Sequence, residues 1–457
     1  MKFPIAYPKP KIETPLLFSN KKLLLLLLPL LVEQTLVISV GVFDTMMVAS
    51  LGEAAVSAVS LVDTINVLVI QVFAALATGG AVVVSQYIGN RAYDKAKSCA
   101  GQLVFLISVS SISMAAVLAI FCPQTLRLVF GTLEADVMSD AQTYLFITAL
   151  SYPFIGLYNG VAALFRAQGN SKISMFASLC MNVVNVGGNA LFIFGFHWGV
   201  FGAAFATLLS RIFAAGIVFV LLQMGQNPLR LDSLKSLLPE KTVVNRILSV
   251  GVPSGIENGM FQFGKLAVSG LVSTLGTAAI AANAVAGTLV SILNIPCSAL
   301  GLGIITVVGQ CIGAGEKEQA KYYSNRLMIY AYVAVVIPNL IAIFCMPYAL
   351  PLFNLSAEAI AIATEVLLIF HFVSFFFFVP SFTVPCALRS AGDAKFTMWV
   401  SIFSVWAFRV VSSYIFVNVF GMGILGVWLG MFVDWIFRSI FYGARYLSWR
   451  WLNKRVI

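Results

Sequence analysis

Asp44 and Glu33 are acidic residues inside a long apolar stretch, which makes them the first candidates for chemistry. They are eleven residues apart, or about 20° apart around a helix at 100° per residue. If that helix crosses a membrane, the shared face must look into the protein, because a charge in hydrocarbon is costly. A carboxylate there can bind a cation or take up a proton. We predict that both bind a coupling cation, with a transient sodium ion near Asp44; the alternative for Asp44 is helix capping.

Other polar side chains recur at helical spacing in the first half of the chain. Two lie three residues apart on the second apolar stretch, and three asparagines lie three and four residues apart on the fifth. We expect them to line a polar cavity, with Asn185 and Asn189 also binding the cation. The alternative is that the asparagines only join helices by hydrogen bonds. The residues concerned are Asp63, Asn66, Asn182, Asn185 and Asn189.

The second half carries a different set of charges, in which acids and bases are mixed. Asp434 precedes Arg438 by four residues, so the two can pair along one helix face. Glu257, Lys265 and Arg409 fall within other predicted helices. The mixture indicates a structural ion-pair network, and gating by rearrangement of those pairs is the alternative.

Motifs for catalysis and for bound cofactors are not found in the sequence. It has no GxxxxGK[ST] phosphate loop, no HExxH and no GxSxG. The seven cysteines are scattered without metal-ligand spacing. We therefore expect no enzyme activity, no structural metal and no cofactor other than a coupling ion.

The elements that must position these residues are membrane helices. Of the 457 residues, 60% are hydrophobic and 10% charged, against roughly 25% charged in soluble domains. The apolar runs are long enough for helices at about 20 residues per crossing and do not alternate as barrel strands do. We predict an all-α integral membrane protein with twelve transmembrane helices near residues 23–47, 54–84, 99–121, 140–161, 173–195, 199–222, 248–272, 278–308, 327–346, 359–380, 396–418 and 424–445.

The basic residues predict an orientation for these helices. With the amino terminus in the cytoplasm, inside segments hold 23 Lys or Arg, outside loops hold only Arg127, and four fall within spans. Both termini are then cytoplasmic. The net charge of +10 is accordingly a topology signal, with attraction to membrane lipids as a secondary effect and no nucleic-acid partner. We expect a multi-pass protein of the plasma membrane, most simply a bacterial inner membrane, and a monomer.

An internal repeat covers nearly the whole chain. Residues 29–97 align without gaps on residues 253–321 with 19 identities in 69 positions, including Glu33 with Glu257. "LFRAQGNSK" (164–172) likewise aligns with "ALRSAGDAK" (387–395). Six helices per half is an even number, so the two pseudo-symmetric lobes are related by an axis along the membrane normal.

The repeat also predicts how the chain is divided. Between the lobes, a linker reads either as an amphipathic surface helix or as a solvated connection. The predicted divisions are a cytoplasmic basic tail at 1–22, which looks disordered, a six-helix lobe at 23–222, the cytoplasmic linker at 223–246, a second six-helix lobe at 247–446 and a cytoplasmic basic tail at 447–457.

Several motifs together resemble the multidrug and toxic compound extrusion (MATE) family of transporters. They are "FDTMMVASLG", "VVVSQYIGN", "VVGQCIGA", "NALFIFG" and the two loops quoted above. The resemblance implies two six-helix lobes and export of mostly cationic, amphipathic compounds coupled to sodium or protons. It also places Asp44 where the family has an acid in its first helix.

The chain departs from that resemblance at three positions. Asn189 lies where many proton-linked members have Asp, and Phe261 and Phe378 lie where some sodium-linked members have acids. Neither coupling scheme is carried over intact, so the ion is sodium or a proton.

Two functions fit the sequence. The first is a secondary antiporter that exports cationic small molecules by alternating access of its lobes. The alternative is a flippase for lipids or lipid-linked saccharides, for which basic cavity residues are expected. The acids of the first lobe, Asp44 and Asp63, favour cationic cargo.

Overall fold

The computed structural model describes residues 15–225, 227–231, 237–353 and 355–457. Within these ranges every regular element is helical, and no strand occurs. A chain in hydrocarbon must satisfy its backbone hydrogen bonds internally, and a helix does so within a single segment. The all-α class predicted from the sequence is therefore observed.

The chain forms two compact units. Leu24–Gly255 make up one, which we call the amino-terminal unit, and Ile256–Ile457 together with residues before Leu24 make up the other, the carboxy-terminal unit. Two long helices, α1 (Asn20–Ala49) and α9 (Lys241–Val272), contribute residues to both units. The domain divisions predicted from the sequence remain predictions.

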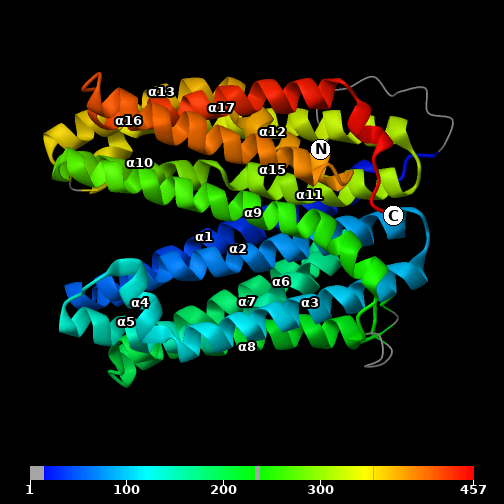
Figure 1. Cartoon of the computed structure of the whole chain (residues 1–457), viewed down its shortest axis with the longest axis horizontal. Coiled ribbons are helices and arrows are strands. Elements are labelled where there is room, and N and C mark those ends of the chain that lie inside the picture. The colour runs from blue at the N-terminus through cyan, green and yellow to red at the C-terminus, as the bar shows by residue number, and fades with distance from the viewer. Residues whose placement is uncertain (1–14, 226, 232–236, 354) are drawn as a thin grey trace. The chain divides into compact units, whose positions relative to one another are not determined.

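In the amino-terminal unit, α2 is central and packs against α3, α5 and α6, while α8 packs against α5, α6 and α7. Glycine permits one of these approaches: a Cβ at Gly80 of α2 would overlap Leu103 of α3. Figure 1 shows these helices in blue to green. The elements are α2 (Glu53–Gly89), α3 (Tyr93–Ile120), α4 (Cys122–Phe130), α5 (Ala135–Leu150), α6 (Tyr152–Ala167), α7 (Ser171–Asn189), the π-helix η1 (Ala190–Gly195) and α8 (Gly199–Gln223).

In the carboxy-terminal unit, α17 packs against α13, α16 and η5, and α11 packs against α12 and α14. The buried ring of Trp435 on α17 contacts the rings of Phe370, Phe378 and Phe382. The elements are η3 (Ser273–Leu275), α10 (Thr277–Leu293), α11 (Ile295–Gly313), α12 (Lys317–Ala349), η4 (Leu350–Phe353), α13 (Ala357–Phe382), α14 (Val384–Ser390), α15 (Ala394–Phe403), the π-helix η5 (Ser404–Val410), α16 (Val411–Asn418), α17 (Gly423–Leu447) and η6 (Arg450–Asn453).

The helices account for most of the predicted membrane crossings. Among the described residues, ten helices are long and apolar enough to cross a membrane, and the pair α5 and α6, bent by 45°, brings the number to 11. Helix α9 is not among them; its 32 residues include four charged side chains. The twelfth crossing therefore remains a prediction.

Three breaks between consecutive helices each have a proline near the start of the second helix, and the first two of these breaks fall inside predicted spans, 140–161 and 278–308. Pro153 begins α6 after α5, Pro296 begins α11 after α10, and Pro385 begins α14 after α13. Proline lacks the backbone N–H that a continuing helix would use, but it fits the first turn of a new one.

A glycine retained by the repeat has a backbone reason. Gly52 and Gly276 occupy equivalent positions before α2 and α10, with φ of 106° and 90°. Residues with a side chain rarely adopt such values. Both copies of the repeat thus need glycine to begin the second helix.

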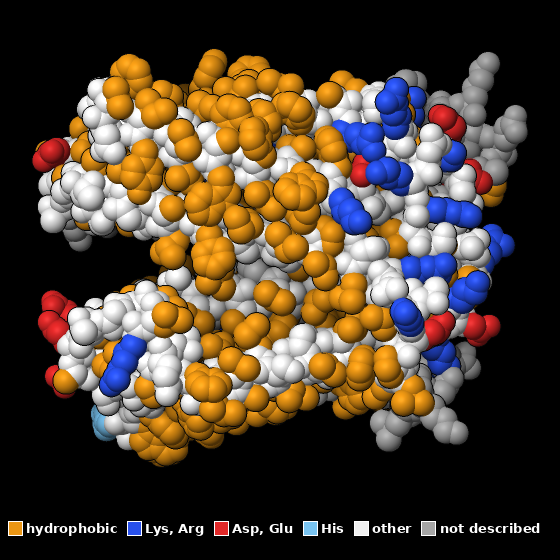
Figure 2. Space-filling model, in the orientation of Figure 1, with side chains coloured by type: hydrophobic (Ala, Val, Ile, Leu, Met, Phe, Trp, Pro, Cys, Tyr) orange, Lys and Arg blue, Asp and Glu red, His pale blue; other side chains and the backbone are white. Residues whose placement is uncertain are grey.

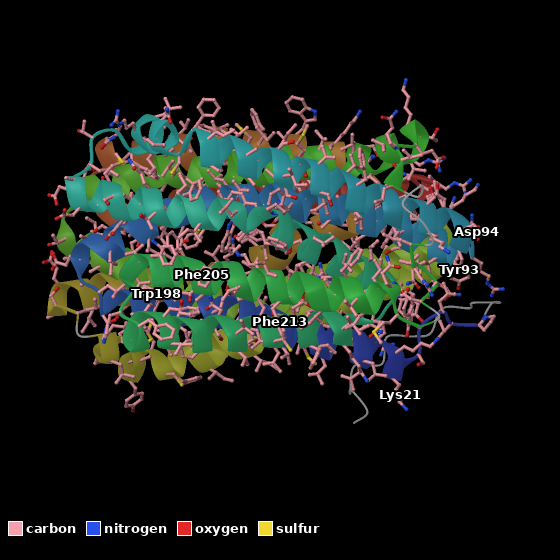
Figure 3. All side chains as sticks on the ribbon, turned by 90° about the horizontal axis from the view of Figure 1, so that it is seen from below. Lys21, Tyr93, Asp94, Trp198, Phe205 and Phe213 are labelled. Atoms are coloured by element: carbon pink, nitrogen blue, oxygen red, sulfur yellow. The ribbon has the colours of Figure 1, made fainter. Side chains whose placement is uncertain are left out.

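Within each unit, Lys and Arg side chains gather at one end of the helices (Figure 2). In the amino-terminal unit this end includes Arg91 after α2, Lys95 on α3 and Lys172 on α7, whereas Arg127 lies on α4 after α3 has crossed the unit. Trp198 and Phe205, whose rings contact each other, lie far from Tyr93 and Asp94 at the start of α3 (Figure 3). Which end faces the cytoplasm remains a prediction.

The described part of the predicted amino-terminal tail, residues 15–22, includes residues that pack on the protein. Residues 1–14 lie outside the described residues, but at Leu17 and Phe18 the backbone N–H groups donate to Gln319 Oε1 and to the Tyr323 hydroxyl at 3.0 and 3.1 Å. Phe18 is buried, and α1 begins at Asn20. The prolines and lysines near the start of the chain predicted a disordered tail, but Leu17 and Phe18 contact Gln319 and Tyr323 of α12.

The described residues of the predicted linker (223–246) and of the predicted carboxy-terminal tail (447–457) also pack on the protein. In the linker, residues 226 and 232–236 lie outside the described residues, Leu229 is buried, and Gln102 Nε2 donates to the Leu238 carbonyl at 2.7 Å. In the carboxy-terminal segment, Trp451 is buried and Lys454 Nζ pairs with Asp393 at 2.6 Å. Neither described part is a free tail.

Candidate functional site

Asp44, one and a half turns before the end of α1, accepts a hydrogen bond from Asn189 Nδ2 of α7 at 2.5 Å. Asn189 is buried and Asp44 is half-buried. Asn189 is the last residue of α7 before the π-helix η1, a segment type often found at functional sites. The acid predicted as the main candidate therefore has a side-chain partner that the sequence also singled out.

The asparagine stripe of α7 extends this contact towards α8. Asn189 Nδ2 lies 3.5 Å from Asn185 Oδ1, and Asn185 Nδ2 lies 3.4 Å from Thr207 Oγ1 of α8. Asn182 is different: it donates to the Ser178 carbonyl of its own helix at 2.8 Å. In the described residues it makes no hydrogen bond to the other asparagines, so the structure does not bring it to Asp44.

Asp63 and Asn66 of α2 form a second hydrogen-bonded pair near Asp44. Asn66 Nδ2 donates to Asp63 Oδ1 at 3.0 Å, and the Tyr152 hydroxyl of α6 donates to Asn66 Oδ1 at 2.8 Å. Asn66 is buried, whereas Asp63 is exposed. Asp63 is close enough to interact electrostatically with Asp44.

Arg211 of α8 is a member that the site prediction missed. Its guanidinium interacts electrostatically with both Asp44 and Asp63, and its Nη1 donates to Ser151 Oγ at 2.6 Å. A basic residue inside an apolar span was the available signal, but spacing alone could not link it to acids on other helices. We call Asp44, Asp63, Asn66, Asn185, Asn189 and Arg211 the Asp44 cluster; with two acids and one base it is acidic.

One acceptor in the Asp44 cluster has no donor. Oδ1 of Asn189 is buried and has no hydrogen-bond partner within the described part of the chain. A carbonyl oxygen beside a carboxylate is the ligand chemistry that hard cations prefer. Among the described residues no group of three or more His, Cys, Asp or Glu could hold a metal, so ligands here would include amide oxygens.

Glu33 is not part of the Asp44 cluster. It is buried and paired with Arg166 Nη1 of α6 at 2.8 Å, and the Ser174 hydroxyl of α7 donates to its Oε2 at 2.6 Å. Eleven residues at 1.5 Å each put it about 16 Å along α1 from Asp44. The shared helix face was predicted, but the two acids have separate partners.

The carboxy-terminal unit repeats this arrangement. Glu257 of α9 pairs with Arg389 Nη1 of α14 at 3.3 Å and accepts a hydrogen bond from Thr397 Oγ1 of α15 at 3.1 Å. These three residues are the repeat equivalents of Glu33, Arg166 and Ser174. We call each set a Glu–Arg–hydroxyl triad. Glu257 thus lies in a triad, and in the described residues no ion pair joins it to Arg409 or Arg438.

The remaining predicted charges of this unit meet around Asp434. Arg438 Nε contacts Asp434 Oδ1 at 2.8 Å, which is the pair expected from their spacing, and Arg409 Nη2 of η5 contacts Oδ2 at 2.9 Å. Lys265 of α9 forms no ion pair in the described structure, but it interacts electrostatically with Arg409. We call Arg409, Asp434, Arg438 and Lys265 the Asp434 cluster.

Aromatic rings take the places where the resemblance would have acids. The Phe261 ring lies 4.9 Å from the Arg409 guanidinium carbon and 5.4 Å from that of Arg438. Phe378 stacks on Phe382 with ring centroids 4.8 Å apart. At Phe261, cation–π contacts thus stand where a carboxylate would hold a cation, whereas Phe378 contacts other rings.

The chain resembles known proteins of one family. The sequence model of the family described as MatE matches the chain twice, at residues 29–191 and 253–415. The two matches begin 224 residues apart, which is the offset of the internal repeat. They include both Glu–Arg–hydroxyl triads.

Curated relatives match over nearly the whole chain. A probable multidrug resistance protein NorM of Thermotoga maritima is 29% identical over 98% of this chain and 96% of its own length. The multidrug export protein MepA of Staphylococcus haemolyticus is 23% identical over 74% of this chain and 75% of its own length.

Solved structures share the fold. A crystal structure of a MATE protein in complex with MaL6 matches with a TM-score of 0.87 and 19% identity, covering 94% of this chain and 97% of that one. A Pyrococcus furiosus transporter of the MOP superfamily, described as having a binding pocket of reverse polarity, matches with a TM-score of 0.85 and 20% identity over 95% and 96%.

Proposed function

Because the chain belongs to the multidrug and toxic compound extrusion family of transporters, we propose that it is a secondary antiporter. It exports organic, mostly cationic and amphipathic compounds, and a sodium or proton gradient drives the export through alternating access of two lobes. The names of the relatives, multidrug resistance and multidrug export proteins, support the export of several drugs.

The Asp44 cluster is the observation that carries the proposal. Its carboxylate, the unpartnered Asn189 Oδ1 and the nearby Asp63 offer negative charge and oxygen ligands inside a membrane helix bundle. A coupling ion and a cationic substrate would compete for that charge, which is the minimal requirement of antiport. Arg211 limits the net charge to −1, so one monovalent cation neutralises the group.

The proposal includes an arrangement in the membrane. The chain crosses the membrane twelve times, with α9 as the crossing that carries charge, and both termini are cytoplasmic. It acts as a monomer in a bacterial plasma membrane, contacts membrane lipids and needs no cofactor beyond the coupling ion. The basic helix ends in Figure 2 support this orientation.

The test is efflux of a panel of cationic dyes from vesicles, with sodium and proton gradients imposed separately. We expect one gradient to drive efflux by the wild-type protein, and Asp44→Asn to lose at least about tenfold in rate, which corresponds to 1.4 kcal/mol. The matched control is Val268→Asn, at the repeat equivalent of Asp44 in the other unit.

Each outcome bears on the proposal. Efflux by Asp44→Asn at the wild-type rate would remove the coupling role of Asp44. Equal losses in both variants would mean that a polar substitution at this helix position is harmful whatever its charge. Efflux that responds to neither gradient would overturn the antiport mechanism.

A further inference from the structure

The Asp434 cluster buries more positive than negative charge. Arg409 is 6% exposed and Arg438 3%, and they share one carboxylate, that of Asp434, which is 0% exposed. Lys265 adds a third positive charge at the edge. An excess charge in an apolar interior is unfavourable unless a counterion accompanies it.

Two buried donors of the cluster have no acceptor. Arg409 uses Nη2 and Arg438 uses Nε to contact Asp434, which leaves Arg409 Nε and Arg438 Nη2 without a hydrogen-bond partner in the described part of the chain. Buried guanidinium donors are rarely left unpaired. Their planar shape suits the two oxygens of a carboxylate.

The surroundings of the guanidinium groups are aromatic. Phe261 of α9 lies against both arginines, and the Phe382 ring lies 5.7 Å from the Arg438 guanidinium carbon. Lys265, one helical turn after Phe261, is exposed, whereas the arginines are buried. Gly264 allows α9 and η5 to pack closely, because a Cβ at this position would overlap Val405 of η5.

We propose that Arg409, Arg438 and Lys265 form an anion site that accepts the carboxylate of an amphipathic aromatic substrate. The carboxylate takes the unpartnered Arg donors, the aromatic body lies along Phe261 and Phe382, and Lys265 forms the entrance. The site lies wholly within the carboxy-terminal unit. It rests on the proposed export function, to which it adds a second substrate class.

Binding of radiolabelled benzoate to the full-length protein in lipid nanodiscs tests the site without any gradient. We expect saturable binding by the wild-type protein, and a loss of affinity of at least tenfold in Lys265→Gln and in Arg409→Lys. Lys321→Gln is the control, because Lys321 stacks on Trp449 at 4.5 Å, away from the cluster, and should bind like wild type. Size-exclusion profiles identify misfolded protein. Because Lys265 is exposed, we expect Lys265→Gln to fold, so it tests the site even if Arg409→Lys does not fold.

Three results would overturn the site. The first is no saturable benzoate binding by the wild-type protein. The second is unchanged binding in Lys265→Gln. The third is displacement of benzoate by chloride as effective as that by unlabelled benzoate, which would make this a site for any small anion. Absent dye efflux would contradict the proposed export function alone, since benzoate binding is measured without transport.

Discussion

The two units share a buried ion pair and differ in the charge placed next to a π-helix. In the amino-terminal unit, Asn189 immediately before η1 contacts the acid Asp44. In the carboxy-terminal unit, Arg409 inside η5 contacts Asp434 and faces Phe261. One backbone device therefore presents an acidic cluster in one unit and a basic cluster in the other.

This difference separates structural from functional charge in a duplicated protein. The Glu–Arg–hydroxyl triads occur in both units, so they belong to what every copy of the repeat needs. Asp44 and Asp63 have the repeat equivalents Val268 and Gly287, so the acidic cluster belongs to one unit only. Charges that are not duplicated are the better candidates for binding.

Substitutions in the two triads should have the largest effects on the free energy of unfolding. Arg166→Gln leaves Glu33 buried without its partner, which we expect to lower the free energy of unfolding by about 3–5 kcal/mol. Arg389→Gln should cost less, because its contact with Glu257 is 3.3 Å rather than 2.8 Å. Thermal unfolding in detergent measures both. The double variant Glu33→Gln/Arg166→Gln should recover part of the loss, and equal losses for Arg166 and Arg389 would contradict the ranking.

The second-largest difference should be between acids of the two clusters, Asp434 and Asp63, in their contribution to the free energy of unfolding. Asp434→Asn leaves two buried arginines without an acid, so we expect a loss of about 3 kcal/mol in unfolding free energy. Asp63→Asn should change stability little, since Asp63 is exposed and lies beside Asp44. Denaturation of the two variants side by side gives the comparison. A larger loss for Asp63 than for Asp434 would reverse the roles assigned to the clusters.

The hydrogen bond to Asp44 should have a smaller effect, and on transport. Asn189→Ala removes one hydrogen bond to a charged group, worth about 1.5–3 kcal/mol, so dye efflux should fall by roughly tenfold or more. Its repeat equivalent is Ser412, whose hydroxyl is buried without a hydrogen-bond partner in the described residues. Ser412→Ala is the matched control, and an equal loss there would show that the helix position matters more than the bond.

Two glycines give the smallest expected effects, of opposite sign. Gly264→Ala should lower unfolding free energy by about 1–3 kcal/mol, because the new methyl group overlaps Val405. Gly41→Ala in α1 has no neighbour within 4 Å and should raise it by about 0.5–1 kcal/mol through helix propensity. Melting temperatures report both signs. A stabilising Gly264→Ala would mean that α9 and η5 separate easily.

Local patterns in the sequence predicted what is local in the structure. Apolar length indicated the helices, and a four-residue spacing indicated the Asp434–Arg438 pair. The breaks within the spans 140–161 and 278–308 were not predicted, although Pro153 and Pro296 were visible signals.

Contacts between distant helices could not be read from spacing. Asp44 and Asn189 are 145 residues apart, and Glu33 and Arg166 are 133 apart, so their pairing depends on how the helices pack. The same holds for Arg211, whose role depends on acids brought from α1 and α2. Sequence reasoning selected most of the residues in these clusters but not their partners.

The docking of Leu17 and Phe18 onto α12 has a consequence for biogenesis. Their partners Gln319 and Tyr323 are synthesised about three hundred residues after them. Domains generally fold in the order of synthesis, so the amino-terminal unit can assemble before the residues that precede Leu24 have joined the carboxy-terminal unit. Leu17 and Phe18 therefore reach their final position only after α12 has been made, and a nascent chain that ends before α12 leaves them without these partners.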